Sequence, residues 1–180
     1  DISDGNALFG TLHSGVDSGT STIVLVDIGN TTNCVVQELS NSQTSDSDYR
    51  FRSVALSGSN IAYEKIDNDQ DIQIETYNYD EEATNSISGQ DINTFHLRIH
   101  GDYVIWTDLT DQLNIEIFAH RISTSTTWNL TDHPSDQFTP QMDGTRVVWT
   151  DLRNGDGEYW GSYENADIYM YDFANDSLTR

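Results

Sequence analysis

A repeat with a step of 43 residues constrains this chain more than any other feature of its sequence. Gly58, Gly101 and Gly144 recur at that step. Each glycine is followed five residues later by a buried-type aromatic side chain, in turn Tyr63, Trp106 and Trp149. A weaker copy of the same pattern opens the chain at residues 4–9. A step of this length is typical of proteins built from one supersecondary unit that recurs along the chain.

Every copy shows the same succession of short apolar segments separated by turn residues. The segment after each glycine, such as 61–63, is apolar at consecutive positions, as in a strand that lies between two neighbouring sheets. The next segment, such as 72–74, alternates apolar and polar residues with period two. Glycine suits the turn before these strands, because a positive φ costs it little. We therefore predict an all-β fold, a β-propeller of four-stranded antiparallel blades.

The repeat predicts a single β-propeller, as a partial or open ring, over residues 1–180. Its blade units lie at about 1–40, 49–88, 92–131 and 136–180. The first unit begins at its second strand, so we expect this blade to lack its inner strand. We interpret the chain as a fragment of a longer polypeptide; the alternative is self-association or another chain that completes the propeller. In either case exposed blade edges favour association.

The last copy of the repeat carries a pattern that resembles a known family. It contains Gly144, Val147, Trp149 and Asp151, then Arg-Asn-Gly at 153–155 and Asp-Ile-Tyr-Met-Tyr-Asp at 167–172. This pattern resembles the repeats of TolB-like β-propellers, which occur in secreted and cell-surface proteins of bacteria and archaea. The resemblance implies an extracellular, cell-surface or periplasmic location. It implies no particular function, because propellers serve as enzymes, binding modules and scaffolds alike.

Charge excludes several classes of partner. Thirty acidic residues against eight basic ones give the chain a net charge of −22. Such a surface repels nucleic acids and anionic membranes. No apolar stretch approaches the roughly 20 residues of a membrane span, so we expect no membrane insertion. Cys34 is the only cysteine, which excludes a disulfide bond within the chain.

Acidic residues gather in the connections that share one face of a propeller. Asp67, Asp69 and Asp71 stand at alternate positions of one such loop, a spacing of oxygen ligands that suits Ca²⁺. Ile72 stands where a calcium loop of the EF-hand type needs glycine. The three aspartates are our candidate metal ligands and calcium is the possible cofactor. The alternative interpretation is a solvated turn, in which aspartate serves turn geometry.

The last unit is ten residues longer than the unit before it, and the extra length lies in the loop between its second and third strands. That loop contains Tyr159, Trp160 and Tyr163 among glycines and acids. Aromatic side chains of this kind stack on sugar rings or grip a peptide. We therefore predict that these three residues bind a ligand. The alternative is that they pack against the next blade.

Support for catalysis is thin. The sequence contains no Gly-x-Ser-x-Gly motif, no zinc-type cluster of cysteine and histidine, and no phosphate-binding loop. His133 lies on the acidic loop face near Asp132 and Asp136, and we add it to the predicted ligand-binding residues. We assign no catalytic residue. We predict an extracellular binding or scaffold module for protein or carbohydrate partners; the alternative is the propeller of a secreted carbohydrate-active enzyme or peptidase that holds substrate on this face.

Overall fold

The structure is a computed structural model. It describes the backbone of residues 2–3, 6–11, 22–27, 36–40, 50–67, 69–89, 92–110, 114–155 and 165–180, and side chains from residue 51 onward within these ranges. The chain forms two compact units, Asp1–Ile92 and Asn93–Arg180. We call them unit 1 and unit 2 and describe each by itself.

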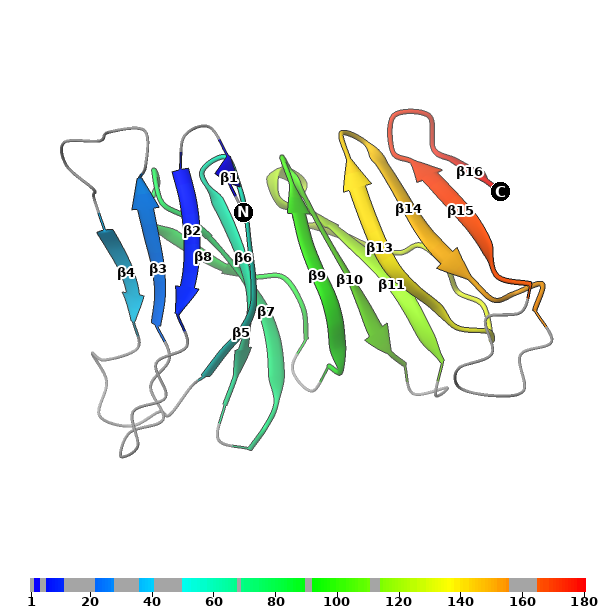
Figure 1. Ribbon diagram of the computed structural model, residues 1–180, viewed down its shortest axis with the longest axis horizontal. Helices are drawn as coiled ribbons and strands as arrows, with labels where there is room; N and C mark the ends of the chain where they lie inside the picture. Colours follow the sequence, from blue (N-terminus) through cyan, green and yellow to red (C-terminus); the bar gives the residue numbers. More distant parts are fainter. Residues whose placement is uncertain are drawn as a thin grey trace. The chain divides into compact units, whose positions relative to one another are not determined.

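Unit 1 contains two four-stranded antiparallel sheets (Figure 1). The strands of the first sheet are β1 (Ile2–Ser3), β2 (Asn6–Thr11), β3 (Thr22–Asp27) and β4 (Val36–Ser40). Those of the second sheet are β5 (Arg50–Ser57), β6 (Asn60–Ile66), β7 (Ile72–Asn78) and β8 (Ala83–Ser86). In both sheets the strands are neighbours in chain order, so each sheet is a meander.

Unit 2 repeats this architecture. One sheet consists of β9 (Thr94–His100), β10 (Tyr103–Leu109), β11 (Ile115–Arg121) and β12 (Thr126–Asn129). The other consists of β13 (Gln137–Asp143), β14 (Arg146–Asp151), β15 (Asp167–Asp172) and β16 (Ser177–Thr179). A single 3-10 turn, η1 (Ile122–Thr124), is the only helical segment among the described residues. The predicted all-β fold of four-stranded antiparallel blades is confirmed.

One detail of the prediction is wrong, because the first sheet has its inner strand. Ile2 and Ser3 form the short strand β1, which pairs with Ala7 and Asn6 of β2. A strand of two residues is too short to show the period-two alternation by which strands are recognised in a sequence. All four sheets are therefore four-stranded.

The repeated glycines occupy the predicted turns. Gly58, Gly101 and Gly144 have φ values of 56°, 56° and 59° and stand first in two-residue turns between inner and second strands. A side chain at such a φ is strained whether or not there is room for it. The 43-residue step of these glycines thus reflects one backbone conformation that recurs in three sheets.

A second backbone feature also recurs every 43 residues, although the residues that adopt it are of three different types. Ser53, His96 and Thr139 all have a left-handed φ, of 51°, 56° and 55°. Each lies in an inner strand where the pairing register shifts against the second strand. These β-bulges bend the inner strand of each sheet. Because serine, histidine and threonine share no turn signature, the sequence did not predict them.

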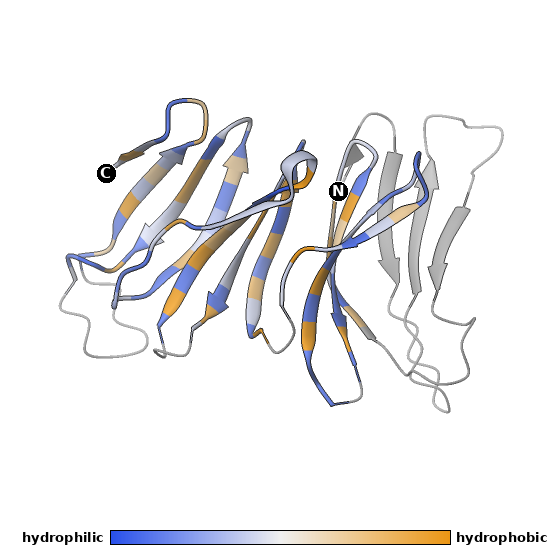
Figure 2. Ribbon diagram, turned by 180° about the vertical axis from the view of Figure 1, so that it is seen from behind, coloured by the Kyte–Doolittle hydropathy of each residue, from blue (hydrophilic) through white to orange (hydrophobic). Residues whose placement is uncertain are grey.

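Each unit has its own apolar core, and the repeated aromatic positions belong to it. In unit 1, Tyr63 is buried with Leu56, Ile61 and Tyr77. In unit 2 one cluster joins the two sheets, with Ile105, Ile117 and Ala119 from β10 and β11 and Val147, Trp149 and Tyr169 from β14 and β15. Apolar segments lie along these strands, and in β10 and β14 they occupy consecutive positions (Figure 2). The core of unit 2 holds β14 and β15 in place, and these two strands carry the candidate site.

Candidate functional site

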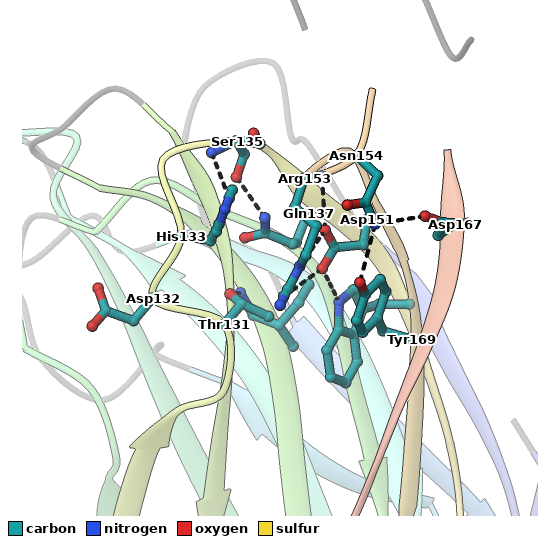
Figure 3. Close-up of polar contacts among 12 residues, drawn as sticks. Thr131, Asp132, His133, Ser135, Gln137, Asp151, Arg153, Asn154, Asp167 and Tyr169 are labelled. Atoms are coloured by element: carbon teal, nitrogen blue, oxygen red, sulfur yellow. Dashed lines mark hydrogen bonds and ion pairs between the residues drawn. The ribbon is translucent and has the colours of Figure 1, made fainter. Parts of the chain in front are cut away.

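The candidate site lies where β14 ends and β15 begins (Figure 3). We call its residues the loop base: Asp151, Arg153, Asn154, Asp167 and Tyr169. The long connection between the two strands starts and returns here. The predicted contact residues Tyr159, Trp160 and Tyr163 lie outside the described residues, whereas both ends of their loop, at Gly155 and Asn165, are described.

Asp151 is the centre of the loop base, and its side chain is fully buried. Arg153 binds it with two donors, Nε to Oδ1 at 2.9 Å and Nη2 to Oδ2 at 2.8 Å. The backbone N–H of Arg153 also donates to Oδ1, at 2.9 Å. Trp149 donates from Nε1 to Oδ2 at 2.9 Å, which ties the ion pair to the core. A bidentate arginine–carboxylate pair of this kind has a fixed geometry.

The environment of Asp151 favours its charged form. Burial alone would raise the pKa of this carboxyl group, but the hydrogen bonds from Arg153 and Trp149 outweigh burial and lower the pKa. The same hydrogen bond with Asp151 raises the pKa of the Arg153 guanidinium. Both groups are therefore charged at neutral pH, and the pair loses its carboxylate only in acid.

The loop base continues from Arg153 across to β15. The guanidinium of Arg153 lies 4.2 Å from the centre of the Tyr169 ring, a cation–π contact. Asn154 donates from Nδ2 to Asp167 at 2.8 Å and to the Tyr169 hydroxyl at 3.2 Å. Arg180 donates to Asp167 at 2.8 Å from the end of the chain described here. The hydrogen bond from Asn154, followed by that from Arg180, lowers the pKa of Asp167.

The backbone fixes the first residues of the loop as well. The N–H of Leu152 donates to the carbonyl oxygen of Asp136 at 3.1 Å, and the N–H of Gly155 donates to that of Leu152 at 2.9 Å. The first bond docks the start of the loop on the connection between β12 and β13, and the second closes a turn within the loop. Side chains and backbone therefore hold the loop at its ends.

His133 lies in that connection and is half-buried. Its Nδ1 accepts a hydrogen bond from the backbone N–H of Ser135 at 3.1 Å, so the neutral ring carries its proton on Nε2. The carboxylates of Asp132 and Asp136, which were expected beside the ring, do not contact it in the hydrogen bonds described for them. Asp136 accepts from the backbone N–H of Ile115 at 2.9 Å, and the exposed side chain of Asp132 points away from the ring (Figure 3). Ligand binding by His133 stays a prediction.

Gln137 is a residue of this region that sequence reasoning missed. It lies between the His133–Ser135 turn and the Asp151–Arg153 pair (Figure 3). Its side chain is fully buried, and Nε2 donates to the carbonyl oxygen of Ser135 at 2.6 Å. Oε1 has no hydrogen-bond partner within the described part of the chain. The repeat could have pointed to Gln137, because the equivalent positions in the two preceding repeats, 51 and 94, hold phenylalanine and threonine and not an amide.

A second buried polar group supports the same connection from β11. Glu116 is buried and accepts hydrogen bonds from the side-chain amides of Asn114 and Asn129. The amide of Asn114 also donates to the carbonyl oxygen of His133 at 2.6 Å. The β12–β13 connection is therefore held by Asn114 and Ile115 at the start of β11 and by Leu152 at the start of the long loop.

The three candidate metal ligands lie in the connection between β6 and β7 of unit 1. Oδ1 of Asp67 accepts the backbone N–H groups of Asp69, at 3.0 Å, and Asp71, at 2.9 Å. This is the pattern of an aspartate that stabilises its own turn. Among the described residues, no group of three or more histidine, cysteine, aspartate or glutamate side chains has an arrangement that could hold a metal ion. Calcium binding by Asp67, Asp69 and Asp71 stays a prediction.

Comparisons with known proteins agree on the fold. No protein-family model matches the sequence, and no curated protein is significantly similar to it. Solved structures do match. TolB from Acinetobacter baumannii superposes with a TM-score of 0.61 at 18% identity, covering 98% of this chain and 41% of that one. Dipeptidyl peptidase 4 from Porphyromonas gingivalis has a TM-score of 0.59 at 13% identity, covering 97% of this chain and 27% of that one.

A third match is the β-propeller domain of the Trilobed protease from Pyrococcus furiosus. Its TM-score is 0.56 at 12% identity, covering 73% of this chain and 41% of that one. The chain thus spans less than half the length of each of these proteins. Its sheets are those of a β-propeller. More specifically, the chain has a TolB-like propeller fold, as the repeat had predicted. Among the described residues, no helix is long and apolar enough to cross a bilayer.

Proposed function

We propose that the chain is a non-catalytic binding module whose contact surface is the loop between β14 and β15. One observation carries this proposal. The loop is ten residues longer than its counterpart in the previous repeat, and the loop base holds both of its ends on a buried, charged framework. Binding residues are commonly found on loops that a rigid scaffold positions.

The composition of the loop fits a contact with a partner. Tyr159, Trp160 and Tyr163 offer large contact areas with few torsions to order, and aromatic side chains are enriched at the energetic centres of interfaces. The net charge of −22 favours a partner with basic groups. We therefore propose a basic peptide segment of another protein as the ligand, met in an extracellular, cell-surface or periplasmic setting. That setting rests on the resemblance to TolB-like repeats.

A second proposal retains the enzyme alternative. Two of the matching solved structures belong to proteases, a dipeptidyl peptidase and the Trilobed protease. In this alternative the loop face holds substrate for a peptidase or a carbohydrate-active enzyme. The two proposals differ in what happens to a bound peptide, which stays intact in the first and is cleaved in the second.

The binding proposal is tested by replacing Trp160 with alanine. Isothermal titration with an arginine-rich dodecapeptide is expected to show saturable binding to the native chain, weaker at high salt because screening reduces attraction between exposed charges. Trp160→Ala is expected to weaken this binding by more than about 1 kcal/mol, or roughly fivefold, with little effect on the melting temperature.

Phe95→Ala is the matched control, because Phe95 is an exposed aromatic residue that belongs to β9 and not to this loop, and is expected to leave binding unchanged. Equal binding by the native chain and Trp160→Ala would contradict the proposal. If the chain bound chitohexaose or cellohexaose and not the peptide, the ligand would be a carbohydrate.

A further inference from the structure

The loop base contains the one Asn-Gly step of the sequence, Asn154–Gly155. At such a step the backbone nitrogen of the glycine can attack the side-chain amide carbon of the asparagine. Glycine favours this attack because it has no side chain to hinder the approach and adopts many backbone conformations. The attack forms a succinimide ring and releases the amide nitrogen as ammonia. Asn154 is exposed, so the water that completes the reaction has access to it.

Hydrolysis of the succinimide by one water molecule gives one of two products. If the bond between the side-chain carbonyl carbon and the nitrogen breaks, the product is aspartate. If the bond between the main-chain carbonyl carbon and the nitrogen breaks, the product is isoaspartate, in which the main chain runs through Cβ. In both cases the sum of the reaction is an amide and water in, a carboxylate and ammonia out. No oxidant or other reactant is needed.

The structure holds both of the groups that must react. The backbone N–H of Gly155 donates to the carbonyl oxygen of Leu152 at 2.9 Å. Nδ2 of Asn154 donates to Asp167 at 2.8 Å and to the Tyr169 hydroxyl at 3.2 Å (Figure 3). The attack requires that Gly155 gives up its hydrogen bond and that the Asn154 amide turns toward it. The closed loop base therefore slows the reaction.

Asp167 protects the amide and does not assist its loss. Hydrogen bonds from Asn154 and Arg180 lower the pKa of Asp167, so its side chain is a carboxylate at neutral pH and supplies no proton to the departing ammonia. The hydrogen bond from Asn154 to Asp167 is exposed, whereas the pair of Asp151 with Arg153 is largely buried. Exposed hydrogen bonds open more readily than the core unfolds. Asn154 is thus released by local opening of the loop base.

We propose that Asn154 is a site of spontaneous deamidation in the folded chain, and that the product prevents the loop base from closing again. A carboxylate at position 154 has no N–H to donate to Asp167 and places a second negative charge beside it. In isoaspartate the longer main chain also moves the N–H of Gly155 away from the carbonyl oxygen of Leu152. This inference does not depend on what the loop binds.

The rate of deamidation at Asn154 tests the proposal. The native chain is incubated at pH 8 with and without guanidinium chloride and then cut with chymotrypsin, which releases residues 150–159 as one peptide. Liquid chromatography with mass spectrometry separates the asparagine, aspartate and isoaspartate forms of this peptide. We expect slow conversion in the folded chain and conversion at least about tenfold faster in denaturant. Asp167→Ala is expected to raise the rate in the folded chain about fivefold, because it removes the charged acceptor.

Asp143→Ala is the matched control, because it removes a fully exposed carboxylate outside the loop base, and is expected to leave the rate unchanged. Circular dichroism checks that each variant is folded. Asn154→Asp supplies one product directly and is expected to speed hydrogen exchange of the Gly155 N–H. The proposal would be overturned if Asn154 stayed intact in the folded chain, if Asp167→Ala and Asp143→Ala deamidated at equal rates, or if Asn154→Asp left the exchange at Gly155 unchanged.

Discussion

Replacing Trp149 with alanine is expected to destabilise unit 2 by about 4 kcal/mol, since removal of a large buried aromatic side chain loses its burial energy and leaves a cavity. Trp149 is 1% exposed and lies in the cluster that joins the two sheets of the unit. It also donates the indole hydrogen bond to Asp151. The melting temperature is expected to fall on the order of 10 °C, as measured by calorimetry or circular dichroism.

Two further variants separate the packing of the Trp149 ring from its hydrogen bond to Asp151 and provide a control for the size of the effect. Trp149→Phe retains an aromatic ring but removes the donor to Asp151, and is expected to lose less stability than Trp149→Ala. Trp128→Ala is the control, because Trp128 is only partly buried at the edge of the same cluster. If Trp149→Ala cost no more than Trp128→Ala, the role of the repeated aromatic position as the core of the sheet would be refuted.

Replacing Asp151 with alanine is expected to cost about 3 kcal/mol at pH 7. The change leaves Arg153 charged in a site where its side chain is only 19% exposed, and leaves the Trp149 N–H without its acceptor. Removing one partner of a buried ion pair is costly because the other charge stays behind. Asp143→Ala is the control, since the Asp143 side chain is fully exposed, and is expected to change stability by less than about 0.5 kcal/mol.

The effect of Asp151→Ala is also expected to depend on pH. The folded protein lowers the pKa of Asp151 below the value of 3.8 that the group has without these contacts. Such a carboxylate contributes stability that is present above that value and is lost as the pH falls through the folded pKa. Denaturant titrations from pH 7 to acid should therefore show the native chain and the variant converging below about pH 4. A difference that stays constant down to pH 2 would contradict the assigned ion pair.

Much of the fold was predictable because the residues that mark its turns and buried strands recur every 43 residues. Three glycines at one step mark three identical turns, and three aromatic residues at the same step mark buried second strands. The features that were missed lack such a signal. The strand at Ile2–Ser3 is too short to alternate, and the bulges at Ser53 and His96 depend on backbone pairing that different residue types tolerate.

Less of the site was predictable, for a physical reason. The sequence showed Asp151 and Arg153 within the pattern of the last repeat that resembles TolB-like propellers, but their mutual pairing depends on where β14 ends and how the loop turns. Asp67 was predicted as a metal ligand because the sequence shows aspartates at alternate positions of its loop. The sequence does not show that Asp67 accepts hydrogen bonds from the backbone of that same loop. Gln137 carries an amide side chain where the equivalent positions hold phenylalanine and threonine, and the sequence does not show that this amide is buried.

We propose that the extra loop makes contact with a partner and is not part of the packed framework. The most direct test is the melting temperature of a chain that lacks residues 156–165. This deletion shortens the connection from Asp151 to Asp167 to the length of that from Asp108 to Asn114 in the preceding repeat. The melting temperature of this variant is expected to lie within about 4 °C of that of the native chain, corresponding to a cost below about 1 kcal/mol. A larger fall would show that the loop is part of the packed framework and would contradict its role as a contact surface.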